Sequence, residues 1–260
     1  MEVNKDLRVS TMTLVSKISS NIDLSKLYEH LGITDTIQFI EYGTNPVKGE
    51  PYKKTNSRNK KSNKPNKPKK PKKFFYNQIT LHCFLDKFVN VKVFNNGRIQ
   101  MTGLRSKKQG ISIINILISE VKNLPKNKLT EILDNSNPEI VSNDIVLINS
   151  DFDIKFKVNR EILQRIVIEG GYYSSYEPLI YPGVNIKYYF NKEKQLTGIC
   201  NCAEQCNGKG KSGFCKKITI AVFNSGKIII TGGQSNEHLN TAHKFITDLI
   251  NEKKKEIMIK

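Results

Sequence analysis

The sequence has no long apolar run, and its acidic residues are few compared with its basic ones. Its 24 Asp and Glu stand against 42 Lys and Arg, which gives a formal net charge of +18 and a pI near 9.6. No stretch is long enough to cross a bilayer, and the first residues lack the apolar region of a secretory signal. These absences predict an intracellular protein with a polyanionic partner, either nucleic acid or an anionic membrane surface.

Histidine and cysteine are also scarce, and their positions argue against two classes of protein. The four histidines are His30, His82, His238 and His243. Their positions show no pairing typical of general acid or base catalysis. Of the five cysteines, four fall within 16 residues, which argues against a disulfide framework spread through a secreted fold. The sequence therefore predicts a protein that is not an enzyme.

One stretch of the chain occurs twice. Residues 94–103 and 223–232 each run from a Phe through an Asn-Asn or Asn-Ser turn, a Gly and a basic residue to a closing Thr-Gly. Asn and Gly tolerate positive φ angles, so the pattern is typical of a tight β-hairpin. Any β protein can contain two similar hairpins, but here the agreement extends to both sides. We therefore interpret the chain as an internal duplication with a period of 129 residues, from 94 to 223.

Each half has the pattern of a strand, a short helix, a meander of strands and a long helix. In the first half, residues 9–18 alternate as a strand, and apolar residues from Leu24 to Leu31 follow the spacing of an amphipathic helix. Ser106 and Gln109 form a capping box before the long helix. The second half repeats this order from residue 145. The pattern predicts an α+β fold with a continuous antiparallel sheet, helices on one face and the other face free for a ligand.

Two insertions and a linker interrupt the duplication. The repeats cover residues 9–122 and 145–252, and residues 123–144, with two prolines, form the linker between them. The first insertion, residues 44–73, holds twelve Lys or Arg and one Glu with hardly any apolar residue, so we expect a disordered basic loop. The second insertion, residues 191–217, is rich in glycine and cysteine.

The cysteines of the second insertion have the composition of a metal site: Cys200, Cys202, Cys206 and Cys215. Four thiolates in a short glycine-rich loop suit tetrahedral zinc, although the spacing is less diagnostic than paired Cys-x2-Cys knuckles. Reactive or disulfide-forming thiols are the alternative. We therefore expect one zinc ion as the candidate cofactor. The lone Cys83 lies within a strand pattern and is expected to be buried packing.

The stretch YSSYEPLIYPG, from Tyr173 to Gly183, together with the repeated hairpin, resembles the TATA-box-binding protein family. The likeness covers both repeats, and the lysine-rich insertion is similar to the divergent members carried by large DNA viruses. The resemblance implies a pseudo-symmetric duplicated saddle, with helices on its convex face, whose underside straddles a widened DNA minor groove. It implies a general transcription factor that bends promoter DNA to nucleate initiation, in the nucleus or at a viral transcription site, with packaging in a virion as a further option.

The resemblance also assigns residues to the DNA-binding surface. The aromatic wedges that unstack base steps in the family fall on Tyr181 and Phe223 in the second half and on Phe94 with Tyr76 (or Phe75) in the first. The groove floor maps onto Thr102, Thr231, Val15 and Ile229. The phosphate contacts map onto Arg98 and Lys227. An ordinary core role for the aromatics is the alternative.

Several floor positions depart from the family. Thr13 and Leu147 stand where the family has a symmetric pair of asparagines, and Gln100 and Asn149 replace valines. An apolar floor disfavours the guanine amino group, so these changes put the preference for A·T in doubt. Glu177 retains an acidic residue that the family offers to transcription factor IIB. The expected partners are therefore double-stranded DNA, a IIB-like protein and RNA polymerase machinery, with no membrane.

Alternatives remain at the level of function. A protein-interaction module that no longer bends DNA, and instead sequesters or scaffolds initiation factors, is favoured by the altered floor and opposed by the wedges. An enzyme on the same sheet is opposed by the lack of an acidic or lysine-centred site. The basic loop lies beside DNA phosphates, serves as a nuclear-import signal, or is only a solvated segment.

Overall fold

The computed structural model describes residues 6–52, 75–193 and 196–259. The chain divides into two compact units. The first unit contains residues 13–144, and the second contains the residues up to 12 together with those from 145 onward. The first unit therefore contains residues 13–122 of the first expected repeat and the expected linker, and the second unit contains the second expected repeat together with residues 9–12 of the first.

The two units contain similar elements. The first unit is built from β1 (Arg8–Ile18), α1 (Leu24–His30), β2 (Ile37–Glu41), β3 (Lys48–Gly49), β4 (Gln78–Phe84), β5 (Phe88–Phe94), β6 (Arg98–Leu104), α2 (Lys107–Lys122) and α3 (Lys126–Ile132). The second unit is built from β7 (Ile140–Asp153), α4 (Arg160–Glu169), β8 (Tyr173–Glu177), β9 (Tyr181–Phe190), β10 (Lys216–Val222), β11 (Lys227–Gly233) and α5 (Asn236–Ile257). The strands β1 and β7 each have residues in both units.

The described strands form a sheet in the order β3-β2-β4-β5-β6-β1-β7-β11-β10-β9-β8. Neighbouring strands within each unit pair antiparallel, as in β4 with β5 and β10 with β11. The expected α+β fold with a large open antiparallel sheet is therefore confirmed. The elements also follow one another in a similar order in the two units, as a duplicated chain would have them.

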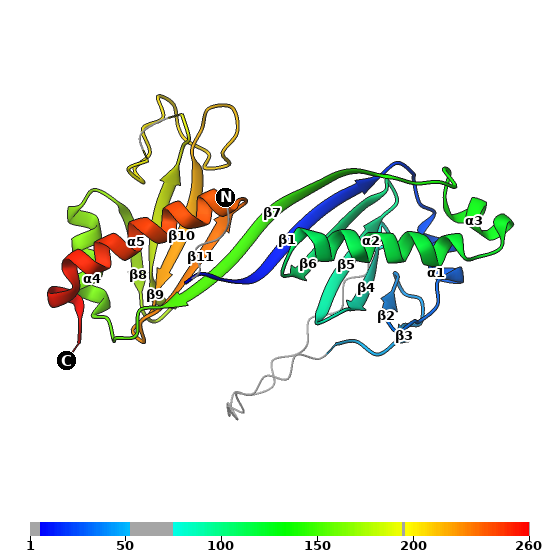
Figure 1. Cartoon of the computed structure of the whole chain (residues 1–260), viewed down its shortest axis with the longest axis horizontal. Coiled ribbons are helices and arrows are strands. Elements are labelled where there is room, and N and C mark those ends of the chain that lie inside the picture. The colour runs from blue at the N-terminus through cyan, green and yellow to red at the C-terminus, as the bar shows by residue number, and fades with distance from the viewer. Residues whose placement is uncertain (1–5, 53–74, 194–195, 260) are drawn as a thin grey trace. The chain divides into compact units, whose positions relative to one another are not determined.

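One side of the sheet in each unit is covered by helices. In β5, Val89, Val91 and Val93 are fully buried, whereas the alternating Asn90 and Lys92 are only half-buried. Because successive side chains of a strand point to opposite faces, the valines face the helices and the polar residues face away. Figure 1 shows α2 crossing one side of β4 to β6 and α5 crossing one side of β9 to β11.

We call the side of each unit opposite α2 or α5 its open face. Cross-strand pairs define it in the first unit, where Lys92 lies opposite Gln100 and Asn90 opposite Thr102. In the second unit, Ile229 lies opposite both Ala221 and Asp151. Further residues of the open face follow from the same alternation along the strands: Thr13, Val15, Phe94, Arg98, Asn149, Lys187, Thr219, Phe223, Lys227 and Thr231.

The duplicated hairpins close in the same way. Gly97 and Gly226 have φ angles of 76° and 86°, and a Cβ on either would lie 2.2 Å from a backbone carbonyl oxygen of Ser20 or Phe156. A side chain is therefore excluded at both turns by conformation and by space. The carbonyl of Gly97 accepts a hydrogen bond from the Ile18 amide, and that of Gly226 accepts one from the Ile154 amide. The two hairpins consequently lock the ends of β1 and β7.

The linker contains regular elements, and part of the basic insertion is more ordered than expected. The linker, residues 123–144, contains α3 and the first residues of β7. At the start of the basic insertion, β3 pairs with β2, and the Lys48 ammonium donates to the carbonyls of Tyr28, Glu29 and Leu31 at the end of α1. A cation there satisfies carbonyls that the helix leaves unpaired. The expectation of disorder is therefore wrong for these residues, and most of the insertion, residues 53–73, lies outside the described residues.

Candidate nucleic-acid interface

The aromatic pair expected in the second unit comes together on its open face. The ring centroids of Tyr181 and Phe223 are 5.7 Å apart, with the rings at 61° to each other. Gly183 makes this contact possible, because a Cβ there would lie 2.9 Å from the Tyr181 ring and 3.2 Å from the Phe223 ring. Tyr181 remains 37% exposed. The pair is therefore an accessible aromatic edge and not part of the helix-covered core.

The corresponding aromatics of the first unit are arranged differently. Phe94 lines a hollow of about 340 Å³ with Val15, Asn77, Asn95, Asn96, Arg98 and Gln100. Tyr76 is 60% exposed, and its ring packs against Tyr42 and close to Gly43. Its hydroxyl lies 3.3 Å from that of Thr44. Phe94 thus opens onto a hollow that contains the expected floor residues Val15 and Gln100, whereas Tyr76 packs on the loop before the insertion.

Thr102 and Thr231 each bond the neighbouring strand on the open face. The Thr13 hydroxyl lies 3.5 Å from that of Thr102 in the first unit, and the Thr231 hydroxyl donates to the side-chain oxygen of Asn149 in the second. Thr13 and Asn149 are therefore equivalent positions. The expected equivalence of Thr13 with Leu147 is wrong by two residues. The reason is that β1 and β7 are offset by seven residues relative to the hairpins, since Ile18 corresponds to Ile154 while Gly97 corresponds to Gly226.

The same offset places Asp151 in the second unit where the first unit has Val15. Asp151 was not expected at the interface, yet it lies directly opposite Ile229. The Arg8 guanidinium donates to both oxygens of its carboxylate, at 2.9 Å and 2.8 Å, and the Lys227 ammonium lies 3.7 Å away. The cation expected to contact phosphate in this unit is therefore already beside a carboxylate, whereas Arg98 lines the hollow near Phe94.

Lys187 is a second residue of the open face that the sequence reasoning missed. It lies opposite Thr219 on β10 and donates a hydrogen bond of 2.9 Å to the hydroxyl of that residue. Burial lowers the pKa of Lys187, and the nearby charge of Lys217 lowers it further. The alternation of β9 could have placed Lys187 on this face, because its neighbours Ile186 and Tyr188 are both buried.

The strands β2, β4 and β5 of the first unit carry a cluster of aromatic side chains on the open face. The Tyr52 ring stacks on Phe88, with centroids 4.2 Å apart, and Phe84 lies 5.0 Å from Phe88. The Tyr52 amide donates to the His82 ring, which stacks on Phe39. Burial lowers the pKa of His82. Tyr52, in the first part of the basic insertion, is therefore fixed on the open face of β4 and β5.

The loop between β8 and β9 presents apolar side chains beside the expected partner-binding residue. The Glu177 carbonyl accepts a hydrogen bond from the Ile180 amide, which makes a tight turn. Leu179 at the tip is fully exposed, at 101% of its reference area, and Ile180 is 79% exposed. Glu177 is itself exposed. The loop thus offers one carboxylate and two aliphatic side chains to a partner.

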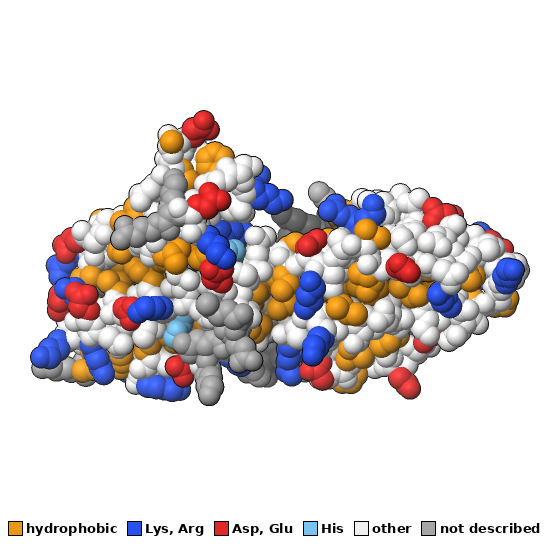
Figure 2. All heavy atoms as spheres, turned by 45° about the horizontal axis from the view of Figure 1, so that its top comes forward, with side chains coloured by type: hydrophobic (Ala, Val, Ile, Leu, Met, Phe, Trp, Pro, Cys, Tyr) orange, Lys and Arg blue, Asp and Glu red, His pale blue; other side chains and the backbone are white. Residues whose placement is uncertain are grey.

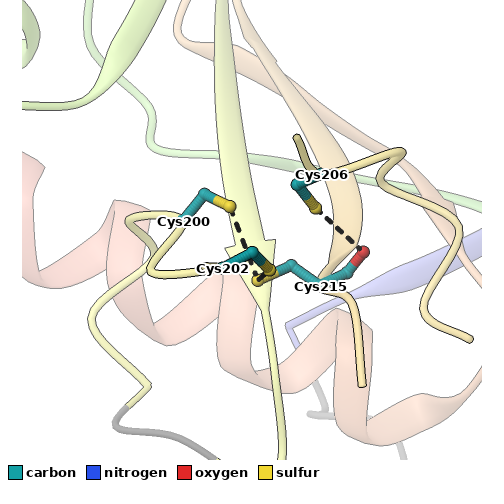
Figure 3. Close-up of side chains that lie close together, drawn as sticks. All are labelled: Cys200, Cys202, Cys206 and Cys215. Atoms are coloured by element: carbon teal, nitrogen blue, oxygen red, sulfur yellow. Dashed lines mark hydrogen bonds between the residues drawn. The ribbon is translucent and has the colours of Figure 1, made fainter. Parts of the chain in front are cut away.

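The four cysteines of the second insertion converge in space, as Figure 3 shows. Their sulfur atoms all lie within 4.8 Å of one another. The Cys202 and Cys215 sulfurs are 3.5 Å apart, and those of Cys215 and Cys200 are 3.9 Å apart. Four sulfurs at about 2.3 Å from a tetrahedral zinc ion would be separated by about 3.8 Å. The cluster therefore has the donor set and nearly the spacing that zinc requires.

Isolated β-bridges hold the cysteine-containing loop on the strands β9 and β10. Tyr189 of β9 pairs with Gly198, and Lys209 pairs with Lys216 of β10. All five cysteines are free thiols, with Cys215 buried. Cys83 is buried in β4, and burial raises its pKa to about 12, as expected for a packing residue. The insertion is thus an extension of the β9–β10 hairpin and lies outside the repeated elements.

Charges on the remaining surface are mixed. On the part of each unit visible in Figure 2, basic and acidic side chains are interspersed and do not form a patch of one sign. Helix α5 illustrates this, because the Lys244 ammonium lies 2.7 Å from the Asp248 carboxylate one turn along. Among the described residues, no helix is long and apolar enough to cross a membrane.

Three comparisons place the chain among known proteins. Residues 144–253 match the family described as "Transcription factor TFIID (or TATA-binding protein, TBP)". The chain is 29% identical, over 273 aligned residues, to a TATA-box-binding protein-like protein of Acanthamoeba polyphaga mimivirus, with 98% of this chain and 67% of the relative covered. It is 26% identical over 164 residues to a TATA-box-binding protein of Methanocaldococcus jannaschii, with 63% of this chain and 69% of the relative covered.

The fold comparison agrees with the sequence comparisons. The structure of a TBP from Methanococcus jannaschii superimposes with a TM-score of 0.55 at 22% identity and covers 95% of this chain and 99% of that one. At this level of identity the likeness concerns the fold alone.

Proposed function

Because the chain is a divergent relative of the TATA-box-binding protein family, we propose that it is a transcription factor that binds duplex DNA through its open face. The matched family is one of transcription factors and not of enzymes. In this proposal the protein bends promoter DNA at the minor groove and so nucleates initiation. The open face supplies the surface and the hairpin ends supply the wedges.

The paired rings of Tyr181 and Phe223 are the observation that carries this proposal. Two aromatic rings in contact, one of them 37% exposed, stand at the edge of a sheet whose floor bears Ile229 and Thr231. Unstacking a base step costs a few kcal/mol, and an aromatic ring can restack on the base that it exposes. The Tyr181 hydroxyl needs either a partner or water when it is inserted. Its position at the accessible edge favours water.

The loop with Glu177 and Leu179 is proposed to bind a transcription factor IIB-like protein. The fully exposed Leu179 supplies the apolar contact and Glu177 the charge. Large exposed apolar side chains grouped on one loop are typical of interaction sites. RNA polymerase machinery would then be recruited through this partner, in the nucleus or at a viral transcription site.

The cysteine cluster is proposed to bind one zinc ion. The residues that would hold it are Cys200, Cys202, Cys206 and Cys215, whose sulfurs lie within 4.8 Å of one another. When bound, zinc at a site of four thiolates is structural, because all its positions are filled by protein ligands. It would fix the loop that extends β9 and β10, and it would take no part in chemistry.

A second candidate function is a module that binds initiation factors without bending DNA. The carboxylate of Asp151 on the open face favours it, because it already engages Arg8 and Lys227, the cations that phosphates would otherwise contact. The two candidates differ in one observable, the bend of a bound duplex.

The proposed function is tested by selecting bound duplexes from random DNA and measuring their bend. A short selected duplex with a dye at each end should show closer ends on binding. Sequence selection with a bend supports the transcription-factor proposal. Absence of duplex binding, with capture of a IIB-like protein retained, would instead establish the interaction module.

A further inference from the structure

Asp151 places a carboxylate among the residues proposed to bind DNA. Its direct cross-strand neighbour is Ile229, so its side chain lies on the open face of the second unit. Arg8 donates hydrogen bonds of 3.2 Å and 2.9 Å to one carboxylate oxygen and 2.8 Å to the other. Lys227 lies 3.7 Å from the same carboxylate. The Asp151 side chain is only 12% exposed, whereas that of Arg8 is 70% exposed.

The first unit has no carboxylate at the equivalent position. Because Ile18 and Ile154 make the same contact to the two hairpins, Val15 is the equivalent of Asp151. Arg98 and Lys227 are also equivalent, since each follows the hairpin glycine. The first unit therefore presents its cation beside an apolar side chain, while the second presents its cation beside an anion.

The neighbouring position adds to this difference. Two residues further along the strands, the first unit has the exposed Lys17, and the second has the exposed Asp153. Asp153 accepts a hydrogen bond of 2.7 Å from the Lys155 amide. The first unit thus carries two cations at positions where the second carries a cation and two carboxylates. Arg8 supplies the only further cation in the contacts described for Asp151.

Competition for these cations follows from elementary electrostatics. A duplex binds basic side chains because each phosphate contact releases condensed counterions. Arg8 and Lys227 already have an anion beside them, so a phosphate that approaches them must share or displace the Asp151 carboxylate. Like charges on the carboxylate and the phosphate also repel each other at close range.

We propose that Asp151 limits the affinity of the second unit for DNA by occupying Arg8 and Lys227. The phosphate contacts are then carried unequally, with the larger share on the first unit around Arg98 and Lys17. This inference rests on the proposed DNA binding and adds to it a residue that sets the strength and the balance of the contact.

The test replaces the carboxylate by an amide of the same shape. Asp151→Asn should bind every duplex more tightly and steepen the plot of log affinity against log salt by about 1–2, because each additional phosphate contact contributes about 0.9. For each new phosphate contact, the ratio of the affinity at 0.1 M salt to the affinity at 1 M salt should be about eightfold larger in the variant than in wild type. Adding Arg8→Ala and Lys227→Ala to Asp151→Asn should remove the gain.

Two variants serve as matched comparisons. Asp86→Asn makes the same charge change in another Asp–Arg pair, since Arg105 lies 3.0 Å from Asp86, which also contacts Gln109 near the start of α2. It should leave the salt slope unchanged. Val15→Asp copies the second unit into the first and should weaken binding and flatten the slope. Thermal unfolding of each variant separates loss of the fold from a change in binding.

The outcomes distinguish this inference from the proposed function. Wild-type protein that binds no duplex would overturn the proposed function and this inference with it. If wild type binds and bends DNA but Asp151→Asn binds equally or less tightly, Asp151 only anchors the start of β1 to β7, and the inference is wrong while the function stands. Equal tightening by Asp86→Asn would also overturn it, because net charge alone would then explain the gain.

Discussion

Asn149 accepts a hydrogen bond from the Thr231 hydroxyl on the open face of the second unit. Its side-chain oxygen is therefore engaged within the protein, and its amide hydrogens remain to be donated. The oxygen keeps a second lone pair that can accept from the guanine amino group, and the amide hydrogens can donate to the minor-groove acceptors that all base pairs present, so this position does not reject G·C as an apolar residue would.

Replacing the polar floor residues should sharpen the preference for A·T. Gln100→Val together with Asn149→Val removes groups that can pair with the guanine edge, and each disfavoured base pair should then cost about 1–3 kcal/mol. Selection of duplexes from random DNA measures the change. An identical selected motif in wild type and variant would mean that the floor does not read the base pairs. Thr219→Val, also on the open face but outside this pair of positions, is a suitable comparison.

Removing the aromatic wedges should abolish the bend. Tyr181→Ala with Phe223→Ala leaves the helix-covered core untouched, so the variant should fold and still bind through its cations while the kink is lost. Energy transfer between dyes at the two ends of a short duplex reports the bend. Tyr173→Ala, which removes an exposed aromatic of β8, is the control and should leave the bend unchanged. An unaltered bend in the double variant would exclude these rings from the mechanism.

Gly183→Ala should disturb the same wedge without removing either ring. The new methyl group would lie 2.9 Å from the Tyr181 ring and 3.2 Å from the Phe223 ring, so at least one ring must move. We expect a smaller bend with little change in the salt slope, because no charge is altered. The same dye pair and a salt titration measure the two quantities separately. A bend equal to that of wild type would show that the rings adjust without loss of function.

Protein purified without chelator should contain about one zinc ion per chain. Cys206→Ser should lose the metal, because a structural site needs all four thiolates, yet DNA binding should persist since the loop lies outside the repeated elements. Metal analysis and thiol titration check both statements. Cys83→Ala is the matched control, because Cys83 is far from the cluster along the chain and buried in β4, and it should retain the metal. Metal-free protein with four reactive thiols would leave the cluster as a set of redox-active or disulfide-forming cysteines.

Deleting residues 53–73 should weaken binding to all duplexes alike. The segment holds eleven Lys or Arg, and with about 3–5 of them contacting phosphates the salt slope should flatten by about 2.7–4.5. The deletion begins after Tyr52 because Lys48 and Tyr52 are part of the ordered first unit. Bend and base preference should be retained. An unchanged slope would favour nuclear import or a protein partner as the role of the loop.

Local sequence was sufficient wherever a feature depends on residues close together in the chain. The hairpins at Gly97 and Gly226 were predictable because positive φ angles at a turn require glycine, and the helix that follows Ser106 was predictable because its cap is three residues away. The four cysteines of the insertion also lie within one short segment, so the sequence could suggest a shared metal site, and the structure brings their sulfur atoms together. The resemblance to a family came from such local motifs.

Only the tertiary structure decided features that depend on strand register. Arg8 and Asp151 are 143 residues apart, and nothing in either neighbourhood indicates that they form a pair. The equivalence of Thr13 with Asn149 was likewise misplaced by two residues, because a shift of two preserves the alternation of faces and leaves no trace in the hydrophobic pattern. The order of β3 depended on pairing with β2 and on the contact of Lys48 with α1, which outweigh a composition typical of disorder. Composition and periodicity thus determined the fold, while hydrogen bonds between distant strands determined which charges share the open face.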